Sequence, residues 1–433
     1  MRRFLSRVLP LLLSFGLIFN CTGCSTVLVL AGKTRENSEA SSSVISESSA
    51  SSGVISTPVP TEDGDLRAFY TDVANAESVT VMVYMIGSDL ESEDGSATDD
   101  LLEMADAALS ENIHLVLQTG GTETWWNDVC TDNESERFVI ENGDMTLLQS
   151  LGSMNMTDAD TLSDFIRFSA ESYPADRYEL ILWDHGGGTM TGFGYDELYE
   201  DTSLTLSSLS TALYNGGVQF DFIGFDACLM ATAEVAYALD PYADYLIASE
   251  ESEPGEGWAY KNWLTMLAED PAVPTAELGK KLADDFLEAY IFADMPTLSV
   301  LDLRYVPELY AALESYWGSA YTALQSGSYG AFSQVRNNVR EFGDNEYDQV
   351  DLSDLATLTK QSLSLGTEDD VQAAVQNMVV YNVTYEKSAA GIAVYFPCLW
   401  PDYYGDTRFE MTCVGFPESY FEFYDKFMNT MLY

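Results

Sequence analysis

The chain has 433 residues, of which 46% are apolar and 12% aromatic, so it is long enough to bury a large core. Its formal net charge of -51 at pH 7 makes a surface that repels nucleic acid, which we exclude as a partner. Its six cysteines are too few for a disulfide scaffold of this length.

The N-terminal segment has the features of a targeting signal rather than of a folded domain. A basic start precedes the apolar run 8–19, which is typical of a bacterial export signal. Thr22-Gly23-Cys24 then resembles a lipobox, in which the cysteine is lipidated and becomes the new N-terminus. We therefore expect a signal peptide over 1–23, a lipid anchor on Cys24 and a Ser/Thr/Pro-rich tether over 24–76. A plain secretory signal or a single anchoring helix is the alternative.

Apolar runs that predict strands alternate with helical periodicity over residues 77–270, which we expect to form one catalytic-core domain. The expected strands are 78–86, 113–118, 178–183, 220–225 and 245–249. The expected helices are 99–109, 158–173, 203–214 and 231–239. This alternation predicts an α/β fold with a mostly parallel sheet and helices on both faces.

Two further regions complete the predicted organisation. Asn142-Gly143-Asp144, between two apolar runs, indicates a β-hairpin. The part 271–433 is less regular, with helices expected at 276–290 and 306–324 and a late strand within 388–397. We expect it to be a C-terminal extension of the same functional region.

Two short motifs follow strand-like runs and carry the chemistry. Leu180-Ile181-Leu182-Trp183-Asp184 leads into His185-Gly186, and Phe222-Ile223-Gly224-Phe225 leads into Asp226-Ala227-Cys228. In parallel sheets functional residues lie beyond the carboxyl ends of strands. A thiol beside an imidazole is the general arrangement of an activated nucleophile. The start of the helix expected after Cys228 would also favour a thiolate.

These motifs resemble those of clostripain-type cysteine peptidases, relatives of the caspases and gingipains. Weaker similar stretches are Val83–Glu91, Ala248–Trp258 and Gly391–Pro397, so the resemblance covers roughly residues 77 to 400. Cys228 follows His185 by 43 residues, in the caspase-like order. The resemblance implies a caspase-like α/β/α sandwich.

The resemblance also implies residue roles. Cys228 would attack the scissile carbonyl, and His185 would activate the thiol and protonate the leaving amine. The backbone N–H groups of Gly186 and Cys228 would form the oxyanion hole, and Gly186 has no Cβ to obstruct the approach. Asp226 would lie in the S1 pocket and select Arg or Lys at P1. A structural acid or a helix N-cap is the alternative for Asp226.

Several neighbouring residues have open roles. His114 is the other histidine, but it lies inside an apolar run and is expected to be a core or edge residue. Asp184 is adjacent to His185, although neighbouring residues of an extended segment point apart. Four acids after the strand at 245–249 are candidates for shaping the pocket: Glu250, Glu251, Glu253 and Glu256.

No cofactor is required by cysteine–histidine chemistry, and no Cys/His cluster suggests zinc. Calcium is a family association, and hard oxygen ligands suit it. An acidic cluster after the first strand is the candidate site, although its spacing matches no EF-hand: Asp89, Glu91, Glu93, Asp94, Asp99 and Asp100.

Two remaining features bear on maturation and redox state. Clostripain-like enzymes are often activated by self-cleavage after a basic residue between the two motifs, but no Lys or Arg lies between Gly186 and Ala227. Self-processing at a basic site there is therefore not expected. Cys398 and Cys413 are candidates for a disulfide in an oxidising compartment.

The sequence thus predicts a surface-anchored cysteine endopeptidase of the bacterial cell envelope, cleaving protein or peptide substrates. The alternatives are a non-catalytic peptide- or glycan-binding lipoprotein on the same fold, and another thiol hydrolase or transpeptidase.

Overall fold

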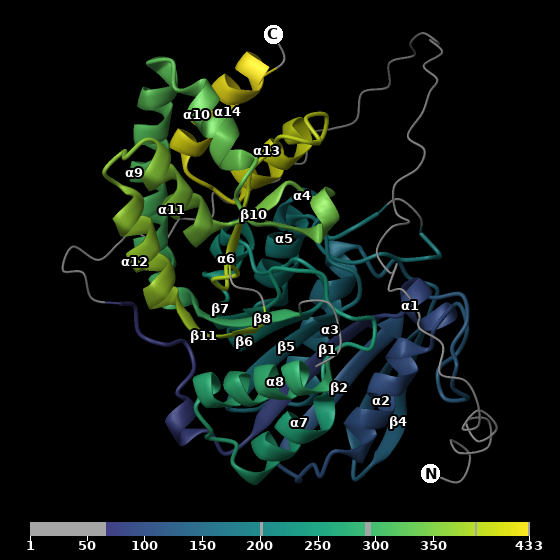
Figure 1. Ribbon diagram of the computed structural model, residues 1–433. Coiled ribbons are helices and arrows are strands. Elements are labelled where there is room, and N and C mark those ends of the chain that lie inside the picture. Colours follow the sequence, from purple (N-terminus) through teal and green to yellow (C-terminus); the bar gives the residue numbers. More distant parts are fainter. Residues whose placement is uncertain (1–65, 200–201, 291–295, 386–387, 432–433) are drawn as a thin grey trace, which may run out of the picture.

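The computed structural model describes residues 66–199, 202–290, 296–385 and 388–431, which form a mixed α/β protein (Figure 1). The predicted signal peptide, the predicted lipidation site Cys24 and most of the predicted tether lie outside the described residues. None of the helices within the described ranges is long and apolar enough to cross a membrane.

A nine-stranded sheet runs through the molecule in the order β11-β8-β7-β6-β5-β1-β2-β3-β4. Its strands are β1 (Val79–Ile86), β2 (Ile113–Gly120), β3 (Ser135–Glu141), β4 (Asp144–Gly152), β5 (Arg177–Trp183), β6 (Phe220–Asp226), β7 (Ala243–Ala248), β8 (Thr297–Asp302) and β11 (Val379–Thr384). Strands β2, β1, β5, β6 and β7 are mutually parallel, and the outer strands are antiparallel. The predicted strands of the core are therefore confirmed.

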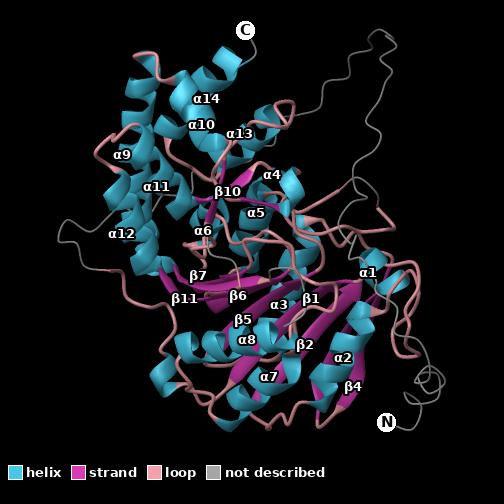
Figure 2. Cartoon of the chain, viewed as in Figure 1, coloured by secondary structure: helices cyan, strands magenta, loops and turns pink. Residues whose placement is uncertain are grey.

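Helices cover both faces of this sheet (Figure 2). They are α1 (Ser88–Ser92), α2 (Ser96–Asp106), α3 (Ala159–Ser172), α4 (Gly188–Thr191), α5 (Leu206–Gly216), α6 (Ala233–Leu239), α7 (Tyr260–Glu269) and α8 (Thr275–Ala289). All eight residues of β1 are buried, and alternate residues belong to two different cores. Tyr84 belongs to the cluster that includes residues of α3, α5 and α6, whereas Val83 belongs to the cluster that includes residues of α2, α7 and α8. This explains why β1 is apolar throughout rather than alternating.

The hairpin predicted at Asn142-Gly143 is confirmed. Strands β3 and β4 are joined by these two residues alone, and their φ angles are +52° and +80°. Two successive positive φ angles are the requirement of the tight turn that the Asn-Gly pair favours.

The part after residue 302 is regular, contrary to the sequence expectation. Its helices are α9 (Val306–Gln325), α10 (Tyr329–Arg336), α11 (Leu352–Ser362), α12 (Glu368–Met378), α13 (Tyr404–Cys413) and α14 (Glu418–Met431). A second sheet, in the order β12-β10-β9, comprises β9 (Glu341–Phe342), β10 (Gln349–Asp351) and β12 (Ala393–Tyr395). Strand β12 lies within 388–397 and confirms the late strand expected there, whereas β9 and β10 were not predicted, because strands of two or three residues leave no periodic pattern.

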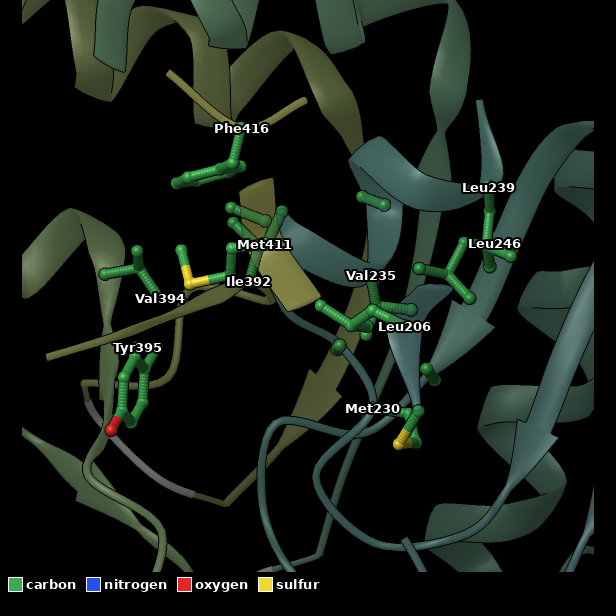
Figure 3. Packing of buried hydrophobic residues seen from close by; sticks show 14 of the residues in the cluster. Leu206, Met230, Val235, Leu239, Leu246, Ile392, Val394, Tyr395, Met411 and Phe416 are labelled. Atoms are coloured by element: carbon green, nitrogen blue, oxygen red, sulfur yellow. The ribbon is translucent and has the colours of Figure 1, made fainter. Parts of the chain in front are cut away.

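The C-terminal part shares one core with the large sheet. Figure 3 shows Val235 and Leu246 on the side of the large sheet, and Ile392, Met411 and Phe416 from the C-terminal part. All five belong to a single buried cluster. In addition, β8 and β11 lie beyond residue 271 and pair within the large sheet. The predicted core and extension therefore pack as one structural unit.

The pairing of Cys398 with Cys413 is wrong. Both are free thiols in the structure, as is Cys130, and Cys413 is exposed. These cysteines supply no covalent cross-link between the described elements.

Candidate functional site

His185 and Cys228 are brought together at the carboxyl ends of two neighbouring strands. Strands β5 and β6 pair in parallel, with Trp183 opposite Asp226. His185 and Cys228 each lie two residues beyond that pair, and both line the same pocket. This is the juxtaposition expected from the two motifs.

The His185 ring is held by Asp89, which the sequence analysis had not assigned to it. Nε2 of His185 lies 2.7 Å from Oδ1 of Asp89, the second residue of α1. Burial works to raise the pKa of Asp89, but its hydrogen bond to His185 and the charge of the ring outweigh burial and lower that pKa. Because Nε2 is bonded to Asp89, proton exchange with a thiol or a leaving group would use Nδ1.

Asp184 anchors the His-Gly loop instead of orienting the ring. Its carboxylate accepts a hydrogen bond from Ser88 Oγ at 2.7 Å and another from the backbone N–H of Tyr195. Burial raises the pKa of Asp184 to about 7. Since Ser88 directly precedes Asp89, this contact also fixes the start of α1 relative to His185.

Cys228 lies in a turn and not at a helix N-terminus, so the predicted support of a thiolate by a helix is wrong. Helix α6 begins only at Ala233, with Thr232 as its N-cap. Cys228 Sγ instead accepts a hydrogen bond from the backbone N–H of Glu253, at 3.2 Å. The residue is 6% exposed. A backbone donor at this distance stabilises a sulfur anion in the way the helix was expected to.

Gly186 touches the backbone of the nucleophile turn. A Cβ at this position would lie 2.0 Å from the carbonyl oxygen of Cys228, so no other residue fits without displacing the turn. The glycine of the His-Gly motif is therefore required by the close approach of two loops. The backbones of Gly186 and Cys228 therefore lie next to each other.

Asp226 lines the pocket beside Cys228 and is not a helix cap. It is the last residue of β6, and its Oδ2 accepts hydrogen bonds from Trp258 N–H at 3.0 Å and from Tyr260 Oη at 2.8 Å. Burial raises the pKa of Asp226 to about 7. The room for Trp258 comes from Gly224, where a Cβ would lie 2.7 Å from the indole ring.

Two further carboxyl groups adjoin Asp226. Asp100 of α2 accepts a hydrogen bond from Trp183 Nε1 at 2.6 Å, and Glu253 lines the pocket. Burial is the main cause that raises the pKa of both well above the usual range, and the neighbouring Asp226 charge adds to it. A Cβ on Gly257 would lie within 3.0 Å of the carboxylates of both Asp100 and Asp226, so this glycine permits the three acids to converge.

The other acids of the loop after β7 have different places. Glu250 is buried and accepts the N–H of Gly391 at 2.7 Å, and Glu251 pairs with Arg340 at 3.0 Å. Glu256 is exposed. Of the four candidates, Glu253 alone lines the pocket.

The acidic residues proposed as calcium ligands make separate contacts in the structure. Asp89 holds His185, Asp100 adjoins Asp226, and Glu91 accepts hydrogen bonds from Thr98 and Trp126. Within the ranges that the structure describes, no group of three His, Cys, Asp or Glu side chains could hold a metal ion. The cluster therefore does not form one ligand set.

His114 is far from the pocket. It lies on β2 opposite Thr80, whose partner on β5 is Tyr178, and its ring contacts Tyr173. Tyr178 precedes His185 by seven residues, which is roughly 20 Å along a strand. His114 is therefore a half-buried residue near the start of an interior strand, and His185 is the histidine that accompanies Cys228.

Comparisons with known proteins agree with this arrangement. A sequence model described as the clostripain family matches residues 83–405. The clostripain of Hathewaya histolytica is 35% identical over 123 residues, which are 24% of this chain and only 23% of that protein. The chain thus matches about a quarter of the length of this relative.

Two solved structures share the fold. One is a secreted C11 cysteine protease from Bacteroides thetaiotaomicron in complex with an irreversible peptide inhibitor, with 19% identity, a TM-score of 0.60, and coverage of 78% of this chain and 99% of that one. The other is an inactive zymogen C11 protease from Parabacteroides distasonis, with 21% identity, a TM-score of 0.59, and coverage of 80% and 98%. The predicted caspase-like α/β/α fold is confirmed by this likeness.

Proposed function

The chain belongs to the clostripain family, and we propose that it is a cysteine endopeptidase in which Cys228 is the nucleophile and His185 the proton carrier. The observation that carries this proposal is that both residues line one pocket, at adjacent strand ends, with the His185 ring held by Asp89 at 2.7 Å. A positioned base beside a thiol is the arrangement that nucleophilic catalysis needs.

In this proposal, His185 takes the thiol proton while Cys228 Sγ attacks the scissile carbonyl carbon. The carbonyl oxygen becomes an oxyanion, which the backbone N–H groups of Gly186 and Cys228 stabilise. The tetrahedral intermediate collapses as His185 returns the proton to the departing amine, leaving a thioester on Sγ. Water, deprotonated by His185, then attacks the thioester and releases the carboxylic acid, and the thiol is regenerated.

The acidic pocket favours Arg or Lys at P1. Asp226 and Glu253 line it, Asp100 lies behind, and no Lys or Arg of the described chain is among its lining residues. Buried carboxyl groups without an internal cation are costly, and a guanidinium or ammonium group from the substrate would relieve that cost. We therefore assign the P1 side chain to this pocket.

The location belongs to the same proposal. The export signal and Cys24 place the protein outside the cytoplasm with an N-terminal lipid anchor and a tether over residues 24–76. The B. thetaiotaomicron protease of the same fold is a secreted protein, which supports an extracytoplasmic location. Mass analysis of the N-terminus tests the anchor, and an unmodified N-terminus elsewhere would disprove it.

Two properties of the family remain predictions for this chain. The absence of Lys and Arg between Gly186 and Ala227 leaves three alternatives for activation: activity as one uncut chain, processing elsewhere in the chain, or a P1 preference that is not basic. No step of the proposed mechanism runs through a metal ion, and calcium dependence is tested by comparing activity in EDTA and in added calcium.

The decisive experiment compares the wild-type protein with Cys228→Ala on peptides that carry Arg, Lys or Ala at P1. We expect wild-type cleavage after Arg or Lys, and loss of at least about 10³-fold in the variant. Cys413→Ala is the matched control, because Cys413 is an exposed free thiol far along the chain. Equal cleavage by the wild-type protein and Cys228→Ala would disprove the proposal.

The alternative function is a non-catalytic peptide- or glycan-binding surface lipoprotein on the same fold. The low exposure of Cys228, at 6%, is the observation that favours it, because a sequestered thiol is typical of a structural cysteine. Labelling of Cys228 by an acyloxymethyl ketone with Arg at P1 separates the two functions. Binding of the peptide without labelling would favour the alternative.

A further inference from the structure

The small C-terminal sheet reaches the turn that carries Cys228. Thr232, shortly after that turn, forms a parallel bridge with Ala393 of β12, whose N–H donates to the carbonyl of Ala231 at 2.8 Å. Cys228 itself belongs to a small buried cluster with Phe342 of β9. The sheet of the C-terminal part therefore packs against the turn that carries Cys228, although none of its residues lines the pocket itself.

Gln349 of β10 connects three loops of the site through one side chain. It is 1% exposed, and its Nε2 donates to the carbonyl of Leu229 at 3.0 Å and to that of Glu250 at 3.3 Å. Its Oε1 lies against the His-Gly loop, because a Cβ on Gly188 would be only 2.1 Å away. Since both neighbouring carbonyls are acceptors, the NH₂ group must face them, which fixes the orientation of the amide.

The residue that receives the shorter of these bonds is conformationally strained. Leu229 directly follows Cys228 and has a φ of +68°, which a branched residue rarely adopts. Such a conformation persists only where its surroundings enforce it. Here the N–H of Leu229 donates to the carbonyl of Glu251 at 3.1 Å, and its carbonyl accepts from Gln349. These two bonds hold both ends of the strained residue.

We propose that Gln349 is a positioning residue for Cys228, an inference that rests on the proposed peptidase function. By holding the carbonyls of Leu229 and Glu250, the amide keeps the nucleophile turn beside the loop after β7, whose Glu253 N–H donates to Sγ. Without the amide, two buried carbonyls lose their hydrogen-bond donor, and we expect the strained turn to relax. A displacement of about 1 Å at a nucleophile can cost roughly 10²-fold in rate.

The test uses Gln349→Met, which keeps the length of the side chain and removes both donors. We expect kcat on an Arg peptide to fall about 10- to 100-fold with KM changed less than about twofold, since the pocket acids are untouched. We also expect slower alkylation of Cys228 by iodoacetamide. Should Gln349→Met not fold, Gln349→Asn serves the same comparison, because its shorter amide cannot reach both carbonyls.

The matched control is Gln118→Met. Gln118 is also fully buried, but it lies on β2 and contacts Arg137 and Met156 rather than any loop of the site. It is expected to lower Tm as much as Gln349→Met and to leave kcat and alkylation unchanged. Unchanged kcat and alkylation in Gln349→Met would overturn the inference. If the wild-type protein cleaves no peptide, the proposed function fails, whereas the alkylation rates still decide the role of Gln349.

Discussion

Strands β5 and β6 carry buried acids at both of their ends, and the two ends differ in where the balancing cation comes from. At the amino end, Arg177 pairs with Asp221 at 2.6 Å and with Glu179 at 3.1 Å, and all three side chains are almost completely buried. At the carboxyl end, Asp226 and Glu253 line a pocket that has no Lys or Arg among its lining residues in the described ranges. The acids at the amino end are paired within the chain, and in our proposal those at the carboxyl end pair with a positive charge of the substrate.

The pKa values at the two ends are similarly raised, and what differs is the cause that opposes the rise. At the amino end, burial raises the pKa of Glu179 to about 8 while the charge of Arg177 opposes that rise. At the carboxyl end, burial raises the pKa of Asp226 to about 7, and only hydrogen bonds oppose it. The same residue types therefore serve stability at one end and, in our proposal, recognition at the other. Removing a charge at each end should separate the two roles.

The largest effect is expected at the amino end. Arg177→Met leaves Asp221 and Glu179 without their cation, and breaking a buried ion pair this way typically costs about 3–5 kcal/mol of unfolding free energy. Urea unfolding measures it. The matched control is Lys261→Met, which removes an exposed pair with Asp106 and should cost less than about 1 kcal/mol. Equal losses in the two variants would contradict the structural role of Arg177.

Asp226→Asn tests the carboxyl end. We expect kcat/KM on Arg peptides to fall roughly 10²- to 10³-fold, because a buried carboxylate that pairs with the substrate is typically worth about 2–5 kcal/mol. Unfolding free energy should not fall, since the amide removes a buried acid that has no internal cation. The comparison is the same variant on a peptide with Ala at P1, where little change is expected. An equal loss on both peptides would remove the role of Asp226 in recognition.

The sequence predicts positions that depend on local pattern better than contacts between distant residues. His185 and Cys228 were predictable because each directly follows an apolar strand, so their positions depend on local sequence alone. Asp89 was not assigned to His185, because their contact joins residues 96 positions apart and its position among other acids suggested a different use. Gln349 contacts Leu229 across 120 positions, from a strand of three residues. No local pattern reveals either contact.

The helix expected directly after Cys228 is a case in which a local pattern predicted an element too early in the chain. Residues 231–239 have helical periodicity, but Leu229 adopts a positive φ and Thr232 pairs with β12, so the helix starts only at Ala233. Tertiary contacts with the C-terminal sheet override the local preference at this point. The same sheet supplies Gln349, so the segment that the sequence described least is the one that shapes the nucleophile turn.

Asp89→Asn is expected to have a smaller effect than Asp226→Asn. The amide keeps the size of the side chain, but it no longer favours one tautomer and orientation of the His185 ring. We expect kcat to fall about 10- to 100-fold while KM on Arg peptides is unchanged, as for other residues that orient a functional histidine. Asp106→Asn is the control, because it removes an exposed carboxylate of α2 that pairs with Lys261. A change in KM alone would place Asp89 in substrate binding.

The smallest effect is a pH dependence of substrate binding, which should arise from the carboxyl end. In the free enzyme the pKa of Asp226 is raised to about 7, so the protonated acid predominates below that pH. A guanidinium binds the ionised form, so KM on Arg peptides should fall as pH rises toward 7, by up to about tenfold per pH unit.

By linkage, a raised carboxyl pKa means that the folded enzyme binds more protons than the unfolded chain between about pH 4 and 7. Unfolding free energy contributed by Asp226 therefore declines as pH rises through that window, and binding of an Arg ligand should release protons and offset the decline. Calorimetry in buffers of different ionisation enthalpy measures that release, and Asp226→Asn should abolish most of it. If Asp226→Asn releases as many protons as the wild-type protein, Asp226 is not the group that pairs with the Arg ligand.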